Sequence, residues 1–113
     1  MKEACDYKLY NIAIRKITDW IKTKELKFDG IFAPPRGGLI MGVHLSHLLN
    51  LPLLLYPTKN SLVVDDIADT GKTLQNIKNK KIITLYYHKE SIIRPDFWVY
   101  EKKNKWITYW WEE

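Results

Sequence analysis

Apolar residues recur at helical spacing near the start of the chain and again in its middle. Between residues 7 and 25 they fall three or four positions apart, which predicts an amphipathic helix that ends before Asp29-Gly30. A second helix is predicted from Leu39 to Asn50, over the segment LIMGVHLSHLLN. The first part of the chain is therefore expected to supply two helices.

Short, wholly apolar runs separate and follow these helices, as is typical of strands buried on both faces. Strands are predicted at residues 31–33, 53–56, 62–65 and 82–87, with further strand-like pieces at 97–100 and 106–109. A short helix is predicted at 71–78. Buried strands that alternate with helices predict a three-layer α/β fold, in which helices flank a mainly parallel sheet.

Two unusual loops follow predicted strands. PPRGG, residues 34–38, has two prolines that bar a helix and two glycines that permit unusual backbone angles. DDIADTGKT, residues 65–73, follows the apolar run of the third strand. Ligands bind at the carboxyl ends of strands in such sheets, so we expect both loops to line one site.

The second loop has the features of a phosphate-binding turn. Its Thr70, Gly71, Lys72 and Thr73 offer backbone N–H groups, two hydroxyl groups and the start of a predicted helix to one phosphate. It is not the P-loop of nucleoside-triphosphate-binding proteins, because that motif needs a glycine where this chain has Asp66.

Three acidic residues accompany this turn. Asp65 and Asp66 would be poor neighbours for a phosphate, but they suit sugar hydroxyl groups or a hydrated Mg²⁺ ion. Asp69 lies next to the phosphate-binding turn. Each acid alone has a simpler interpretation, with Asp69 as a helix cap and Asp65 as a strand end. The complete string of residues favours a ligand-binding site.

Length and composition indicate one domain, residues 1–113, because the chain has 113 residues of which 46% are apolar. The single cysteine, Cys5, cannot form an internal disulfide, and no apolar run is long enough to span a membrane. The segment MKEACDYKLY lacks the apolar core of a secretory signal. We therefore expect a cytoplasmic protein with no membrane partner.

The formal net charge of +5 comes from lysines scattered along the chain, which is typical of a solvated surface. A nucleic-acid partner is therefore not favoured. A basic nucleic-acid-binding module remains an alternative function.

Three segments together resemble the type I phosphoribosyltransferases. LVVDDIADTGKTL, residues 62–74, resembles their motif for phosphoribosyl pyrophosphate (PRPP): an apolar strand, two acids and a DTG-x-T phosphate loop. PPRGGL, residues 34–39, resembles the pyrophosphate loop of the xanthine-guanine branch, and NKWITYWWE, residues 104–112, resembles its purine-covering end. The resemblance implies the phosphoribosyltransferase fold with a minimal hood.

The same resemblance implies a glycosyltransferase of purine salvage. Such an enzyme transfers the 5-phosphoribosyl group from PRPP to a 6-oxopurine, namely guanine, xanthine or hypoxanthine, and releases pyrophosphate. It uses Mg²⁺ as cofactor, and PRPP and the purine base or nucleotide are its expected ligands.

Each matching residue acquires an implied role in binding PRPP. The residues that would bind the 5-phosphate are Ala68, Asp69, Thr70, Gly71, Lys72 and Thr73. The ribose and Mg²⁺ would be bound by Asp65 and Asp66, with Asp66 as the metal ligand. Pyrophosphate would be bound by Arg36 and Gly37, in a loop that often contains a cis peptide.

The purine would meet four further groups. Asp69 would be the catalytic base beside N7, and Lys89 would donate a hydrogen bond to the 6-oxo group. Trp106 would stack on the ring, and the backbone of Ile107 would meet its exocyclic edge.

One departure from the family concerns the lid. A long flexible loop closes over the reacting sugar in the family, whereas only YPTKNS, residues 56–61, separates the second and third predicted strands here. A second hypothesis is therefore a catalytically weak or inactive PRPP- or nucleotide-binding regulator. The aromatic segment at residues 109–111 is the candidate interface of a homodimer, in which a partner subunit would supply the cover.

Overall fold

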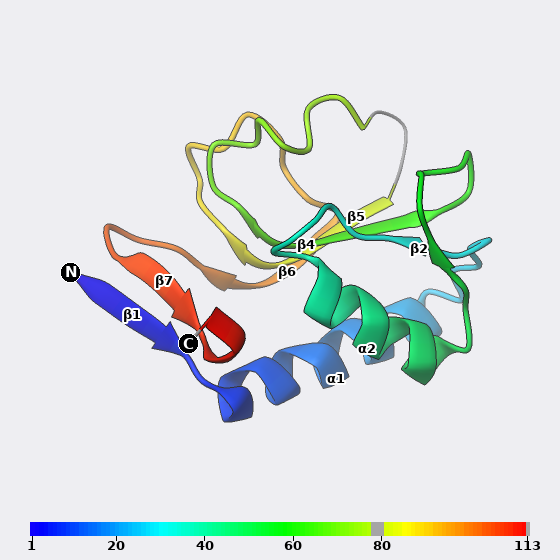
Figure 1. Ribbon diagram of the computed structural model, residues 1–113, viewed down its shortest axis with the longest axis horizontal. Coiled ribbons are helices and arrows are strands. Elements are labelled where there is room, and N and C mark those ends of the chain that lie inside the picture. The colour runs from blue at the N-terminus through cyan, green and yellow to red at the C-terminus, as the bar shows by residue number, and fades with distance from the viewer. Residues whose placement is uncertain (78–80, 113) are drawn as a thin grey trace.

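The computed structural model describes residues 1–77 and 81–112 (Figure 1). Its helices are α1 (Tyr7–Thr23) and α2 (Leu39–Leu49). Its strands are β1 (Lys2–Cys5), β2 (Ile31–Phe32), β3 (Leu53–Leu54), β4 (Leu62–Ala68), β5 (Lys81–Tyr87), β6 (Phe97–Glu101) and β7 (Trp106–Tyr109), and a 3-10 helix, η1 (Trp110–Glu112), follows β7.

Five strands form one parallel sheet in the order β3–β2–β4–β5–β6. The long central strands β4 and β5 pair from Leu62 and Lys81 to Ala68 and Tyr87. Both strands are rich in apolar and β-branched residues, which suits strands covered on both faces. The expected α/β fold with a mainly parallel sheet flanked by helices is confirmed.

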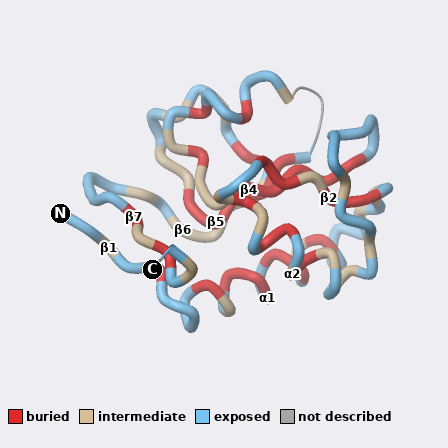
Figure 2. The backbone as a smooth tube through the Cα atoms, viewed as in Figure 1, coloured by how far each residue is buried: buried red, intermediate tan, exposed pale blue. Residues whose placement is uncertain are grey.

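Both helices cover the same face of the sheet, and their inner sides are buried against it (Figures 1 and 2). α1 begins after Asp6, whose side chain accepts a hydrogen bond from the Leu9 N–H at 2.9 Å and so caps the helix. α2 ends at Asn50, whose left-handed conformation is typical of a helix C-cap. Among the described residues, no helix is long and apolar enough to cross a membrane.

Irregular segments cover the opposite face of the sheet. Val63 of β4 and Ile82 of β5 pack there against Leu74, with Ile77 and Ile93 beside them. The third layer therefore consists of loops between strands. These loops bury enough apolar surface to keep water from the second face of β4 and β5.

The helix expected at residues 71–78 is not formed in its described part, and Lys78 lies outside the described residues. Residues 72–76 instead make consecutive turns, in which the Leu74 N–H donates to the Gly71 carbonyl and the Ile77 N–H donates to the Leu74 carbonyl. Only Leu74 and Ile77 have apolar side chains to bury in this stretch. Two such contacts give little tertiary support to a short helix.

A second, two-stranded sheet joins segments from opposite ends of the sequence. β1 pairs in parallel with β7, from Lys2 opposite Trp106 to Cys5 opposite Tyr109 (Figure 1). β1 could not be predicted from sequence, because KEAC has a single buried residue and no apolar run. This small sheet and η1 stand beside the main sheet as the minimal hood that the resemblance implied.

The aromatic segment at residues 109–111 packs largely against other parts of the same chain. Tyr109 is buried and stacks on Trp111 with ring centroids 4.7 Å apart. Trp110 contacts the rings of Tyr7 and Tyr10. These contacts join the segment to α1, and Tyr109 is not exposed as expected, whereas Trp110 is 37% exposed. The homodimer interface at residues 109–111 stays a prediction.

The connection from β3 to β4, residues 55–61, runs back to the edge of the sheet at which β2 and β4 begin. The Thr58 N–H donates to Ser61 Oγ at 3.0 Å, which closes a tight turn. The Asn60 carbonyl accepts from the Asp29 N–H at 3.0 Å, next to the beginning of β2. Because the strands are parallel, this end of the connection lies opposite the carboxyl edge of the sheet. Residues 55–61 therefore provide no cover at that edge.

The packing of α2 against β2 generates a stability prediction at Gly42. Alanine usually stabilises a helix interior relative to glycine by about 1 kcal/mol. Here a Cβ on Gly42 would lie 2.7 Å from the Cβ of Ala33, which is closer than van der Waals contact allows. We expect Gly42→Ala to lower the free energy of unfolding, measured in urea, by about 1–3 kcal/mol. The double variant Gly42→Ala/Ala33→Gly should recover most of the loss, and a single variant more stable than the wild type would contradict this packing.

Candidate active site

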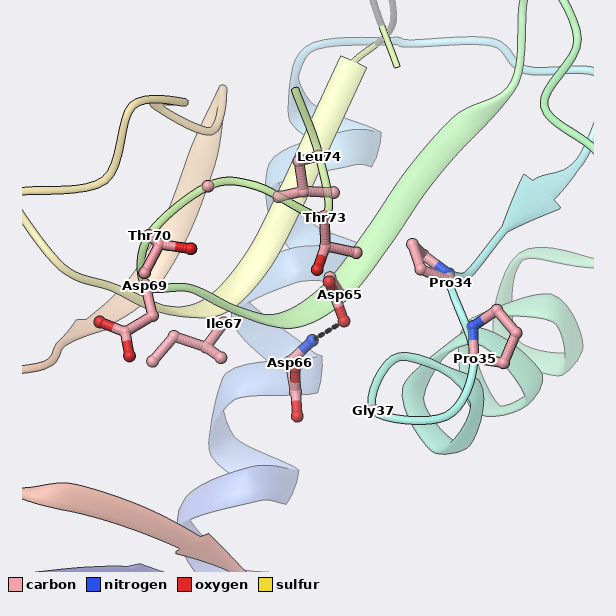
Figure 3. Close-up of a pocket in the computed structure, with 11 residues that line it drawn as sticks. Pro34, Pro35, Gly37, Asp65, Asp66, Ile67, Asp69, Thr70, Thr73 and Leu74 are labelled. Carbon is pink, nitrogen blue, oxygen red and sulfur yellow. Dashed lines mark hydrogen bonds between the residues drawn. The ribbon is translucent and has the colours of Figure 1, made fainter. Parts of the chain in front are cut away.

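The two unusual loops meet at the carboxyl edge of the main sheet, where they line a cavity of about 210 Å³ (Figure 3). One wall comes from the loop after β2 and contains Pro34, Pro35 and Gly37. The other wall comes from β4 and the turn after it and contains Asp65, Asp66, Ile67, Asp69, Thr70, Gly71, Thr73 and Leu74. The structure thus brings together the segments for which the sequence predicted one site.

Two carboxyl groups of β4 lie at the base of this cavity. Asp65 is buried, and its Oδ1 accepts a hydrogen bond from the Asp66 N–H at 2.9 Å. Burial, and then the adjacent Asp66 carboxylate, raises the pKa of Asp65 to about 8. Burial also raises the pKa of Asp66. A bound cation or hydroxyl donors would therefore stabilise the ionised form of these two carboxyl groups.

The glycines of the PPRGG loop permit its close approach to this acid pair. A Cβ on Gly37 would lie 2.6 Å from Asp66 Oδ2, and one on Gly38 would lie 2.7 Å from the Val64 carbonyl oxygen. Any larger residue would therefore force the loop away from β4. The Pro35–Arg36 peptide is cis, as the resemblance implied.

Arg36 lies at the side of this cavity. It lines a neighbouring hollow of about 730 Å³ together with Gly37, Leu39, Ile40, Trp111 and Glu112. Gly37 belongs to both hollows. An anion that extended from the first cavity past Gly37 would reach the guanidinium group of Arg36.

The turn after β4 forms a cradle of backbone N–H groups. Within the described part of the chain, the N–H groups of Thr70, Gly71 and Thr73 donate to no other protein atom, whereas that of Lys72 donates to Thr70 Oγ1 at 3.3 Å. Since residues 72–76 form turns, a phosphate would be bound by these local N–H groups and the threonine hydroxyls.

A second loop, residues 88–93, supports this cradle. The Ile92 N–H donates to the Thr70 carbonyl at 2.9 Å, and the His88 N–H donates to the Ala68 carbonyl at 2.9 Å. Gly71 has a φ of +84°, and a Cβ there would lie 2.7 Å from the Ile93 nitrogen. Glycine is thus required at this position both by the backbone angle and by the contact.

Asp69 follows the end of β4, and each of its carboxylate oxygens lies close to a basic side chain. Lys102 Nζ donates to Asp69 Oδ2 at 2.9 Å, and His88 Nδ1 lies 3.5 Å from Asp69 Oδ1. Its carboxylate is partly accessible, and it lines the cavity of the acid pair. These contacts place an acidic group between the phosphate cradle and β7.

A second cavity, of about 170 Å³, adjoins the first. Asp66, Ile67 and Asp69 belong to both, and the second cavity adds Lys102, Trp106, Ile107, Tyr109 and Glu112. Trp106 is 64% exposed, so one face of its ring is free to stack on a ligand. The structure therefore brings Trp106 and Ile107 next to Asp69.

The structure does not bring Lys89 into this second cavity. Lys89 is exposed and lines a separate hollow of about 120 Å³ together with His88, Glu101, Lys102, Lys103 and Asn104. Its role toward the 6-oxo group stays a prediction.

Sequence reasoning missed Lys102, Tyr109 and Glu112 as lining residues of the second cavity. Lys102 is one of several lysines in EKKNKW, and nothing in that pattern distinguishes it from Lys103 or Lys105. The Tyr109 hydroxyl donates to the Asp66 carbonyl at 3.4 Å, a contact that depends on the position of the hood.

A divalent cation would find two protein carboxylates in the first cavity. Among the described residues, no group of three or more His, Cys, Asp or Glu side chains could enclose a metal ion. Mg²⁺ commonly binds through one or two carboxylates together with substrate phosphates and water. Asp65 and Asp66 therefore suit Mg²⁺ that is bound jointly with a phosphorylated ligand.

Comparison with solved structures identifies the fold. A purine phosphoribosyltransferase from Pyrococcus horikoshii superposes with a TM-score of 0.86 and 29% identity, over 99% of this chain and 94% of that one. The xanthine-guanine-hypoxanthine phosphoribosyltransferase of Helicobacter pylori gives a TM-score of 0.85 and 17% identity, over 99% and 94%. A hypothetical protein from Neisseria gonorrhoeae, solved with bound ppGpp, gives 0.79 and 18%, over 100% and 91%.

The chain therefore has the type I phosphoribosyltransferase fold over nearly its whole length, and the resemblance seen in its motifs is confirmed. Its structural neighbours include purine and xanthine-guanine phosphoribosyltransferases. The sequence itself matched no protein-family model and no curated protein.

The buried acid pair generates a prediction about pH. An unfolded chain releases the Asp65 proton near the ordinary aspartate pKa of about 4, whereas the folded chain retains it up to a pKa of about 8. The folded state binds more protons between these values, so stability should fall as the pH rises through this window. We expect the free energy of unfolding of the ligand-free protein, measured in urea, to decrease between about pH 5 and pH 9.

Asp65→Asn should flatten this dependence, because asparagine keeps an oxygen acceptor for the Asp66 N–H and removes one titratable group. It should also be more stable than the wild type at the alkaline end. Asp19→Asn, on the exposed side of α1, is the matched control and should follow the wild-type curve. A wild-type curve that rises over this range would show that the pair does not retain a proton.

Proposed function

We propose that this protein is a purine phosphoribosyltransferase that transfers the 5-phosphoribosyl group from PRPP to a 6-oxopurine and releases pyrophosphate, as in nucleotide salvage. The observation that carries the proposal is the sharing of Asp66, Ile67 and Asp69 by two cavities. One cavity has a phosphate cradle and an acid pair, and the other has an exposed tryptophan. Two ligands bound in them would meet at these shared residues.

PRPP fits the first cavity and its neighbour. The N–H groups of residues 70–73 would bind the 5-phosphate, and Asp65 and Asp66 would hold the ribose hydroxyls and Mg²⁺. Gly37 and Arg36 would bind pyrophosphate, for which the planar guanidinium fork is well suited. Mg²⁺ would supply positive charge to the leaving pyrophosphate.

The purine fits the second cavity. Trp106 would stack on the ring, and the Ile107 backbone would meet its exocyclic edge. Asp69 would lie beside N7 and accept a proton from the incoming base. The resemblance gives the 6-oxo contact to Lys89, which in this structure lines a separate hollow.

The chemistry needs two partners held in line and a stabilised leaving group. A purine nitrogen forms a bond to C1 of the ribose while the bond from C1 to the pyrophosphate oxygen breaks. The electron pair of that bond leaves with pyrophosphate, and the proton of the base passes to Asp69. The chain's own contribution is positioning, charge complementarity and a proton acceptor.

A second candidate function is a PRPP- or nucleotide-binding regulator of little or no activity. The short connection at residues 55–61 favours it, because a closed lid excludes water from the reacting sugar in such enzymes. Against it, 94% of the Pyrococcus purine phosphoribosyltransferase chain is matched, so little of that chain lacks a counterpart here.

The first test combines ligand binding with turnover. PRPP with Mg²⁺ should raise the melting temperature, because the ligand binds only the folded chain; at a hundredfold excess over its dissociation constant the gain is about 2.7 kcal/mol. Incubation with guanine, xanthine or hypoxanthine should then yield the nucleotide and pyrophosphate. Stabilisation without any nucleotide would support the regulator, and absence of stabilisation at millimolar PRPP would overturn the proposal.

The role of Asp69 yields a separate prediction. Asp69→Asn should keep the stabilisation by PRPP and Mg²⁺ while lowering kcat by about 10²–10⁴-fold, the usual contribution of a positioned acid or base. Asp29→Asn, near the opposite edge of the sheet, serves as the control and should retain wild-type kcat. Unchanged turnover in Asp69→Asn would reduce Asp69 to a structural partner of Lys102.

A further inference from the structure

Lys102 occupies a position in the second cavity for which neither the motifs nor the resemblance gives a role. Its Nζ donates to Asp69 Oδ2 at 2.9 Å and lies 5.9 Å from the ring centroid of Trp106. Its side chain is 15% exposed, so most of it is withdrawn from water. The ammonium group thus lies in the same cavity wall as the expected base and the expected stacking residue.

The main sheet fixes this position. Lys102 directly follows β6, and its N–H donates to the Tyr87 carbonyl at the end of β5 at 3.0 Å. This bond continues the pairing of β6 with β5, in which Glu101 lies opposite Tyr87. The side chain therefore leaves a regular strand end, which holds it more firmly than an exposed loop would.

Lys89 lacks such a position. It is exposed in the loop after β5 and shares a hollow with Lys102 but none with Trp106 or Ile107. Lys102 is the lysine that lines both hollows. Of these two lysines, Lys102 is the one beside Asp69.

The pair of Asp69 and Lys102 presents an acceptor next to a donor. An ammonium group has three N–H donors and no acceptor, so the bond to Asp69 leaves two donors for a ligand. The edge of a 6-oxopurine has an acceptor at O6, whereas adenine has an amino donor at position 6. N7 is common to both bases, so a donor beside position 6 distinguishes them.

We propose that Lys102 is the specificity-determining residue of the purine site: held by Asp69 beside Trp106, it donates to the 6-oxo group and disfavours a 6-amino base. This inference rests on the proposed function, because it assumes that a purine occupies the second cavity. It goes beyond that function by assigning the choice of base to a residue at the end of β6.

A purely structural ion pair is the competing interpretation. In that case, removing the charge would lower the melting temperature through the lost contact between Lys102 and Asp69, and it would weaken all purine nucleotides equally. A specificity role instead changes the ratio of affinities for 6-oxo and 6-amino nucleotides. The two interpretations therefore differ in a ratio that overall stability does not affect.

The test measures dissociation constants of GMP, IMP and AMP by titration calorimetry with the full chain. The wild type should prefer GMP and IMP over AMP by about tenfold to a hundredfold, the value of a hydrogen bond to a charged group. Lys102→Gln should reduce this preference to about threefold or less, mainly by weakening GMP and IMP. Lys103→Gln is the matched control, because Lys103 is exposed and paired with Glu101 outside the cavity, and it should keep the wild-type preference.

Three outcomes would overturn the proposal. In the first, the wild type binds AMP as tightly as GMP, or binds neither nucleotide. In the second, Lys102→Gln keeps the wild-type preference for GMP and IMP. In the third, Lys89→Gln loses that preference and Lys102→Gln keeps it. Stabilisation by PRPP and Mg²⁺, measured on the same samples, separates this result from the proposed function. If PRPP stabilises every variant while the preference is unchanged, only the role of Lys102 fails; if PRPP stabilises none, the proposed function fails as well.

Discussion

Asp65 and Asp66 lie on β4, the middle strand of the parallel sheet. Their carboxyl groups determine how the rest of the site is arranged. Burying charge without a partner is costly, and Asp65 is only 6% exposed, with Asp66 partly buried beside it. The PPRGG loop approaches them with glycine backbone because no side chain fits there. A ligand that brings a cation and hydroxyl groups would relieve the cost, and the cavity opens at this point.

The parts of the fold that could be predicted from sequence are those in which local pattern and tertiary burial agree. α1 has a cap at Asp6 and a continuous apolar stripe, β4 begins with the apolar run 62–64, and β5 is mostly apolar. β1 could not be predicted, because only Cys5 of its four residues is buried and its partner lies at the other end of the sequence. The helix expected at 71–78 is not formed in its described part, because its stretch has only two apolar side chains to bury and Thr70, just before it, is held by a hydrogen bond from the Ile92 N–H.

The residues of the candidate site likewise include some that could be predicted from sequence and some that could not. The acids and the phosphate-binding turn are neighbours in sequence, so a strand followed by a turn brings them together, and their motif could be recognised. Lys102 meets Asp69 only through the register of β6 against β5, which no single-sequence pattern encodes. Lys89 lies in the loop of residues 88–93, which contacts the end of β4 and the turn after it through His88 and Ile92.

Because β1 pairs with β7, the wall that carries Trp106 and Ile107 joins the segments most distant from each other in sequence. Closing so long a loop is entropically unfavourable, and a two-stranded ladder has little stability of its own. The acid pair and the turn after β4 depend instead on the five-stranded sheet. In transient openings of the mature fold, we therefore expect the hood to separate before the main sheet, so that the wall with Trp106 and Ile107 opens while the cavity of Asp65 and Asp66 stays intact.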